Sequence, residues 1–151
     1  MKIKEIMTTQ PKTASRDTTL AAAAHLLWGA DCGILPLVDG GKLVGVVTDR
    51  DMYVALATRN KPASQITVGD VATGKVWACG PDDDVHVALD TMASQRVRRL
   101  PVTENGALVG IISMNDLVLA AGADKAVRND EVVATLTAIC AHHAAPAAAA
   151  A

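Results

Sequence analysis

Apolar residues recur at helical spacing in two stretches of the chain. Each stretch has apolar residues at the i, i+3, i+4 and i+7 positions, which predicts a helix beginning near residue 20 and another near residue 85. The positions are Leu20, Ala23, Ala24 and Leu27, and Val85, Ala88, Leu89 and Met92. Side chains that favour helix starts precede both, so we expect an N-cap at Asp17 or Thr18 and at Asp82 or Asp83.

Two short apolar runs follow each predicted helix and suit a hairpin. The first run carries a proline in both places, ILPLV at 34–38 and RLPVT at 99–103, which predicts an edge strand because proline cannot donate to a ladder. Turn residues follow, DGG at 39–41 and ENG at 104–106, before the runs LVGVVT and LVGIIS. The sequence therefore predicts a helix and then a hairpin, twice.

A further helix is predicted after each hairpin, over about 49–58 and about 114–121. Between the two halves, Pro62 in the segment RNKPASQ indicates a linker. Near the C-terminus, an amphipathic helix is predicted from Asn129, with acidic residues in its first turn. Its apolar stripe consists of Val132, Val133, Leu136, Ile139 and Cys140.

The chain is a tandem repeat with an offset of 65 residues, and the pairing needs no gap from Ile3 to Leu56. A unit of about 55 residues has a small core, so we expect the two copies to pack together. The equivalent residues include Pro36 and Pro101, Gly45 and Gly110, and Asp51 and Asp116. We divide the chain into repeat one (1–58), a linker (59–67), repeat two (68–121), a helical extension (122–141) and an alanine-rich tail (142–151).

Composition narrows the function classes. The formal net charge is only −2, and the chain has two Trp, one Tyr and no Phe, which argues against a nucleic-acid binder with a basic, aromatic surface. No apolar run approaches the roughly 20 residues that span a membrane. The N-terminal MKIKEIMTTQP lacks the apolar core of a signal peptide. We therefore expect a cytoplasmic protein without a membrane or nucleic-acid partner.

Candidate metal and catalytic groups are sparse. The cysteines Cys32, Cys79 and Cys140 form no CxxC pair, so we expect reduced and mostly buried thiols. The run DDD at 82–84 is better explained by helix capping than by a metal. Cys140 with His142 and His143 is a candidate soft-metal cluster, but adjacent histidines in a frayed terminus are the better explanation. We predict no metal site, no catalytic residue and no obligatory cofactor.

A short motif recurs where each hairpin meets its helix. LVGVVTDRD places Asp51 three residues after Thr48, and LVGIISMND places Asp116 three residues after Ser113. As structure, this spacing resembles a capping box. As a site, a helix start offers N–H groups and a positive dipole end to an anion, and an aspartate can accept both hydroxyls of a ribose. One copy favours a cap, whereas recurrence in the same context favours a nucleotide site.

These segments resemble the CBS domain pair, also called a Bateman module. The resemblance rests on LPLVDGGKLVGVVTDRDM and RRLPVTENGALVGIISMNDL, on the helix before each, and on the opening segments MTTQPKTAS and ATGKVWACG, and it covers roughly residues 1–121. With the short C-terminal helix, the plan is similar to stand-alone bacterial CBS-pair proteins of the hypoxic response type. It implies an α/β (α+β) fold of two β-α-β-β-α repeats packed as a pseudo-twofold pair.

The resemblance also implies two clefts between the repeats for an adenine-bearing ligand. AMP, ADP or ATP would be the first choice, and S-adenosylmethionine or NADH the second. By position, Asp51 and Asp116 would bind ribose, and Thr48 and Ser113 would lie near phosphate. The backbone around the two Leu-Pro pairs would flank the base, at Ile34 and Pro36 and at Arg99 and Pro101.

The repeats differ where phosphate charge should be met. Repeat two has three arginines before its Leu-Pro, Arg96, Arg98 and Arg99, whereas repeat one has Asp31, Cys32, Gly33 and Ile34 there. Because a guanidinium suits phosphate oxygens, we predict that the cleft at Asp116 binds better than the cleft at Asp51. The alternative is that these arginines are solvated surface charge. Arg50 is another candidate for the phosphate contact, although we expect it to project outward.

The resulting hypothesis is a regulatory module without enzymatic activity. It would bind an adenine nucleotide, form a disk-like homodimer and signal through an unidentified protein partner. The alternative is a ligand-free dimerisation or interaction protein whose T-x-x-D motifs are only helix caps.

Overall fold

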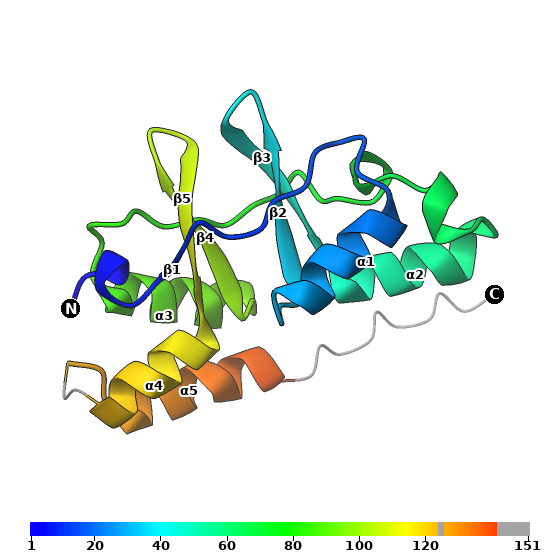
Figure 1. The fold of residues 1–151 in the computed structure, drawn as a ribbon. Helices are drawn as coiled ribbons and strands as arrows, with labels where there is room; N and C mark the ends of the chain where they lie inside the picture. The colour runs from blue at the N-terminus through cyan, green and yellow to red at the C-terminus, as the bar shows by residue number, and fades with distance from the viewer. Residues whose placement is uncertain (124–125, 142–151) are drawn as a thin grey trace.

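The computed structural model describes residues 1–123 and 126–141, which contain two antiparallel hairpins surrounded by helices (Figure 1). The α+β prediction with two repeats and a C-terminal helix is confirmed. Repeat one contains β1 (Thr8–Thr9), α1 (Leu20–Gly29), β2 (Ile34–Asp39), β3 (Lys42–Thr48) and α2 (Asp49–Arg59). Repeat two contains α3 (Val85–Gln95), β4 (Arg99–Glu104), β5 (Ala107–Ser113) and α4 (Met114–Ala123), and α5 (Asn129–Cys140) follows. Short 3-10 turns are η1 (Ile3–Glu5), η2 (Ala63–Gln65) and η3 (Val68–Asp70).

The two hairpins have the same register and the same turn. Strands β2 and β3 pair from Ile34 opposite Thr48, and β4 and β5 pair from Arg99 opposite Ser113. The turn residues have positive φ, 55° and 79° at Gly40 and Gly41 and 52° and 83° at Asn105 and Gly106. Two such residues make the tight turn whose twist matches the flanking strands. The hairpins meet where Lys42 of β3 pairs with Ala107 of β5.

The first helix of each repeat begins where predicted, at Leu20 and at Val85, but its N-cap lies one or two residues later than expected. The Thr19 side chain caps α1 by accepting from the Ala22 N–H at 3.2 Å, and Asp84 caps α3 by accepting from the His86 N–H at 3.0 Å. The expected caps serve the preceding turns instead. Thr18 accepts from the Ser15 N–H, and Asp83 accepts from the Gly80 N–H.

The opening segment of repeat one crosses to repeat two before it returns. Ile3 is fully buried in the core of repeat two, and β1 pairs with β5, with Thr8 opposite Ile111. The chain then reaches repeat one, where the Ala14 N–H donates to the Pro36 carbonyl at 2.9 Å. Figure 1 shows this blue segment running from the side of α3 and β4 to the side of α1.

The segment between the repeats makes the reciprocal crossing. Ile66 and Val68 are buried in the core of repeat one, and Thr73 forms a bridge with Val46 of β3. Cys79 then bridges Val102 of β4 in repeat two. Each hairpin is therefore lined by an opening segment that belongs to the other repeat. This exchange of opening segments joins the two halves of the chain.

The glycine of each LVG motif makes room for a crossing segment. A β-carbon at Gly45 would lie 2.9 Å from the Thr73 carbonyl oxygen, and one at Gly110 would lie 3.0 Å from the Thr8 carbonyl oxygen. Real β-carbons essentially never come closer than 3.0 Å to another heavy atom, and a contact at 3.0 Å requires the neighbouring atom to shift. The two glycines are thus explained by the backbone that passes over them.

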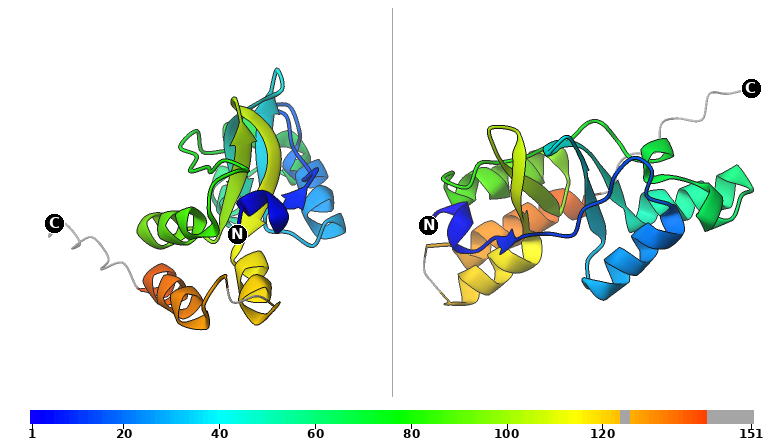
Figure 2. Two further views of the ribbon diagram at one scale, coloured as in Figure 1. Left: turned by 90° about the vertical axis from the view of Figure 1, so that its left-hand side faces the viewer. Right: turned by 45° about the horizontal axis from the view of Figure 1, so that its top comes forward.

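Helix α5 packs against α3 and α4 of repeat two, which breaks the symmetry of the pair (Figure 2). Val132 and Thr135 of α5 are buried, whereas Val133 is 60% exposed and Cys140 is exposed. The predicted stripe was therefore wrong at Val133 and Cys140, because the buried face of the helix is rotated toward Thr135. Among the described residues, no helix has the length and apolar character to cross a membrane.

Candidate functional site

Two clefts lie at the edges where the repeats exchange their opening segments. The Asp116 cleft has a volume of about 340 Å³, and the Asp51 cleft has a volume of about 590 Å³. The Asp116 cleft includes Thr8, Gln10, Lys12, Asp31, Cys32, Ile34, Arg99, Ser113, Asn115 and Asp116. The Asp51 cleft includes Ile34, Thr48, Asp49, Arg50, Asp51, Thr73, Lys75, Trp77, Arg96, Arg98, Arg99, Pro101 and Ile139. Both repeats contribute to each cleft.

Thr48 and Asp51 form a complete capping box at the start of α2. Asp51 Oδ2 accepts from the Thr48 N–H at 2.9 Å and from the Thr48 hydroxyl at 2.6 Å, and that hydroxyl accepts from the Asp51 N–H at 3.2 Å. The single hydroxyl proton of Thr48 is therefore already donated. Since a phosphate needs a donor, Thr48 can approach one only by giving up its bond to Asp51.

Ser113 and Asp116 repeat this arrangement at the start of α4. Asp116 Oδ2 accepts from the Ser113 N–H and from the Ser113 hydroxyl, both at 2.7 Å. In both motifs, the hydrogen bonds from the described residues go to Oδ2 of the aspartate. Each carboxylate can thus cap its helix and still offer Oδ1 to the hydroxyls of a ligand.

The start of α2 does not offer the unpaired N–H groups that the sequence interpretation assigned to an anion. The Asp49 N–H donates to the Gly33 carbonyl at 3.4 Å, the Arg50 N–H to the Asp49 carboxylate at 2.7 Å, and the Asp51 N–H to Thr48. These three N–H groups are therefore already hydrogen-bonded within the protein. An anion in this cleft must therefore be met by side chains.

The four residues that were expected to flank the base are not divided evenly between the two clefts. Ile34 and Arg99 line both clefts, and Pro101 lines the Asp51 cleft. Pro36 is not among the lining residues of either cleft, because it is buried in β2 beneath the opening segment that bonds to its carbonyl. The backbone contact expected of Pro36 is thus made within the protein.

Two of the three arginines of repeat two were assigned to the wrong cleft. Arg96 and Arg98 line the Asp51 cleft, and Arg99 lies between the two clefts and contributes to both. The absence of a side chain at Gly33 leaves space there, since a β-carbon at that position would lie 2.9 Å from Asp49 Oδ2 and 3.4 Å from Arg99 Nη1. The error arose because residues near each other in sequence were assumed to share a cleft, whereas each cleft combines the motif of one repeat with the strand entry of the other.

Equivalent positions of the two clefts carry different charges. With the 65-residue offset, Gln10 of the Asp116 cleft corresponds to Lys75 of the Asp51 cleft, and Asp31 corresponds to Arg96. Asn115 corresponds to Arg50, which lines the cleft, contrary to the expectation that it projects outward. The Asp51 cleft thus has five basic side chains against two acidic ones, whereas the Asp116 cleft has two of each.

Sequence reasoning missed several residues of the Asp51 cleft, including Lys75, Trp77 and Ile139. Lys75 and Trp77 come from the opening segment of repeat two, and Ile139 comes from α5. The repeat offset pairs Trp77 with Lys12, but it does not reveal that this segment lies over the hairpin of the other repeat. Near the same edge, Arg98 Nη2 lies 4.0 Å from the Cys140 sulfur, so the end of α5 borders the basic wall of this cleft.

The cysteines differ in their surroundings. Cys79 is buried, and burial raises the pKa of its thiol to about 11, so it is a poor nucleophile. Cys32 is partly buried and Cys140 is exposed, which corrects the expectation of mostly buried thiols. His142 and His143 of the candidate metal cluster lie outside the described residues. Within residues 1–123 and 126–141, no group of three or more metal-binding side chains is found.

The sequence of each repeat matches a family model described as the CBS domain, over residues 3–58 and 68–122. The chain belongs to the CBS-domain family. It is 38% identical over 121 residues to the uncharacterized protein YlbB of Bacillus subtilis, a match that covers 79% of this chain and 81% of that protein. The sequence similarity therefore extends over most of both proteins.

Two solved CBS structures also resemble this chain over most of its length. The CBS domain pair of protein MJ0100, in complex with 5′-methylthioadenosine and S-adenosyl-L-methionine, has a TM-score of 0.74 and 29% identity and covers 82% of this chain and 97% of that chain. Hypoxic response protein I, with two coordinated zinc ions, has a TM-score of 0.72 and 28% identity and covers 79% and 98% of the two chains. CBS pairs are regulatory modules, and the first of these structures holds nucleoside ligands.

Proposed function

We propose that the protein is a regulatory sensor that binds an adenine nucleotide, of the AMP, ADP or ATP class, between its two CBS repeats. The observation that carries the proposal is the repeated Thr/Ser-x-x-Asp element, which lines a cleft in both halves and is faced by residues of the other repeat. The nucleoside ligands of the MJ0100 pair support a ligand with an adenosine part. S-adenosylmethionine and NADH are second choices.

The Asp51 cleft is the preferred site in this proposal, in place of the Asp116 cleft favoured by the sequence. Asp51 accepts the ribose hydroxyls through Oδ1, while Oδ2 continues to cap α2. Arg98 and Arg99 take the phosphate role that the sequence interpretation gave to Thr48, because their N–H groups are donors and carry positive charge. In the Asp116 cleft, the negative charge of Asp31 would repel a phosphate.

Calorimetric titration tests the proposal. Wild-type protein is titrated with AMP, ADP, ATP, NADH and S-adenosylmethionine, and the same titrations are repeated with Asp51→Asn and Asp116→Asn. Asparagine keeps one oxygen that can accept the capping bonds, and its amide nitrogen, a donor, replaces the second oxygen that would accept from the ribose. We expect Asp51→Asn to weaken nucleotide binding by about tenfold or more, and Asp116→Asn to change it little. Binding of none of the five compounds by the wild-type protein would refute the proposal.

A ligand-free dimerisation or interaction protein is the second candidate, and one observation favours it. The same capping geometry occurs at Thr67 and Asp70, where Asp70 Oδ2 accepts from the Thr67 N–H and hydroxyl at 3.1 and 2.9 Å. Neither residue lines the Asp51 or the Asp116 cleft. A T-x-x-D motif in this chain can therefore serve as a cap alone.

In either candidate function, the protein forms a homodimer and acts by binding another protein. Large apolar side chains on the helices support a dimer, since Trp28 is 85% exposed, Tyr53 73% and Leu119 71%. The proposal includes no catalytic step and no obligatory cofactor. The cytoplasmic location stays a prediction from the sequence.

A further inference from the structure

Trp77 is placed in the Asp51 cleft by a segment that is fixed at both ends. At one end, Thr73 exchanges two backbone hydrogen bonds with Val46 of β3, at 3.0 and 3.1 Å. At the other end, the Cys79 N–H donates to the Pro101 carbonyl at 3.1 Å. The residues between these anchors span the cleft from one repeat to the other, so Trp77 belongs to its wall.

The indole of Trp77 is accessible and already holds a cation. The residue is 37% exposed, and Lys75 Nζ lies 5.1 Å from the centre of its ring. A cation over an indole face is a weak contact at an exposed site, so it yields readily to a better partner. A planar base that is itself π-rich can occupy the same face by stacking.

The surroundings of Trp77 are unlike those of its counterpart. Lys12 stands at the equivalent position of the Asp116 cleft, so an aromatic wall occurs in one cleft and not in the other. The aromatic side chain lies in the same cleft as the basic ones, since Arg98, Arg99 and the ribose-type carboxylate of Asp51 also line it. Together these groups match the three parts of a nucleotide: a base, a ribose and a charged phosphate chain.

We propose that the Asp51 cleft binds a purine nucleoside di- or triphosphate, with Trp77 stacked on the base and Lys75 transferred from the indole to the phosphates. This inference rests on the proposed function and narrows its ligand class. The excess of basic over acidic side chains favours two or three phosphates over one, because each added phosphate supplies charge-assisted hydrogen bonds to the guanidinium groups. The charge-balanced Asp116 cleft has no such preference.

The chain contains two tryptophans, so replacing Trp28 leaves Trp77 as the only indole. Trp28→Phe changes a side chain that is 85% exposed and lines neither cleft, and its fold can be checked by circular dichroism. Titration of this variant with ATP should change the Trp77 fluorescence saturably. We expect AMP to bind about tenfold or more weakly than ATP, and adenosine more weakly still.

Calorimetry with matched variants completes the test. Trp77→Leu should weaken ATP binding by about 5- to 100-fold, the range that corresponds to a stacked base, whereas Lys12→Leu should leave it unchanged. The inference is overturned if ATP binds but the Trp77 fluorescence stays constant, if AMP binds as tightly as ATP, or if Lys12→Leu is the more damaging change. These outcomes leave the proposed function standing, whereas an absence of binding by every adenine compound refutes both.

Discussion

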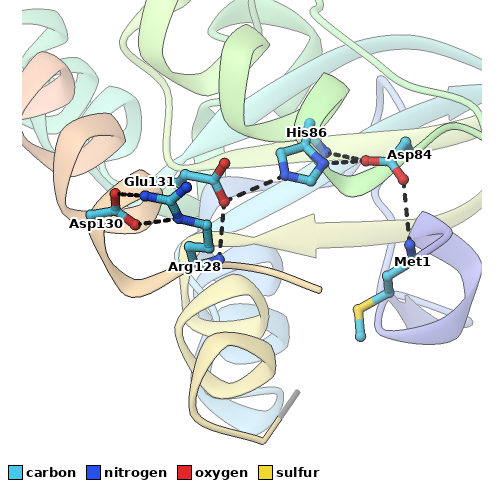
Figure 3. Close-up of polar contacts among 6 residues, drawn as sticks. All are labelled: Met1, Asp84, His86, Arg128, Asp130 and Glu131. Carbon is cyan, nitrogen blue, oxygen red and sulfur yellow. Dashed lines mark hydrogen bonds and ion pairs between the residues drawn. The ribbon is translucent and has the colours of Figure 1, made fainter. Parts of the chain in front are cut away.

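The imidazole of His86 joins α3 to α5, because its Nε2 lies 3.4 Å from the carboxylate of Glu131 (Figure 3). Its Nδ1 contacts the Asp84 carboxylate, which also accepts from the Met1 ammonium at 3.3 Å. Glu131 in turn accepts from the Arg128 N–H at 3.0 Å. A single ring therefore lies between two acidic groups, one at the start of each helix.

This arrangement predicts that stability depends on pH near neutrality. The hydrogen bond to Asp84 raises the pKa of His86 above its ordinary value of 6.5, burial opposes this, and the charges of Asp84 and Glu131 add to it. Because the folded protein holds the proton more tightly, the stabilising contribution is complete below the ordinary pKa and is lost as pH rises through the raised one. Thermal denaturation should show a falling midpoint over this window.

His86→Gln should remove this pH dependence, while His25→Gln, a change of an exposed histidine on α1, should retain it. An equal slope in wild-type protein and His86→Gln would show that other groups cause the effect.

The crossing segments predict a second result. Gly45→Ala forces a β-carbon against the Thr73 carbonyl oxygen, which is backbone and held by the bridge to Val46. We expect the free energy of unfolding to fall by about 1–3 kcal/mol, as for other overpacked sites. Gly74→Ala is the control, because a β-carbon there meets no atom within 4 Å. Denaturant unfolding measures both, and equal stability of the two variants would contradict the role assigned to Gly45.

The elements of each repeat could be predicted from the sequence because their signals are local. The turn residues predicted the hairpins, and Gly40 and Asn105 indeed have positive φ. The helical spacing of apolar residues predicted α1 and α3. The N-cap residues were misplaced by one or two positions, because neighbouring hydroxyl and acidic groups compete for the same role and only the turn geometry decides among them.

The clefts could be predicted only in part, because they depend on contacts between distant segments. The motif residues Thr48 and Asp51 were found from their recurrence, but Lys75 and Trp77 were not, since the exchange of opening segments has no signal within either repeat. The same exchange moved Arg96 and Arg98 to the Asp51 cleft. Knowledge of which repeat each segment packs against was the missing information.

Helix α5 offers a matched pair of adjacent valines. Val132 is 5% exposed and packs in the core of repeat two, whereas Val133 is 60% exposed. We expect Val132→Ala to lower the free energy of unfolding by about 1–3 kcal/mol through lost burial and a residual cavity. Val133→Ala should stay within about 0.5 kcal/mol of wild type. Chemical denaturation distinguishes them, and a larger loss at Val133 would restore the predicted stripe.

The exposed apolar residues on three helices predict how the protein associates. Trp28 of α1, Tyr53 of α2 and Leu119 of α4 are each more than two thirds exposed, and burial of such side chains against a second copy would remove apolar surface from water. Sedimentation velocity of the wild-type protein should therefore give a dimer. Tyr53→Lys and Leu119→Lys should shift it toward monomer by introducing like charges into the contact. Ser94→Lys, on the exposed surface of α3, should leave the dimer intact. A dimer that all three lysine variants retain, with unchanged concentration dependence, would mean that a different surface joins the copies.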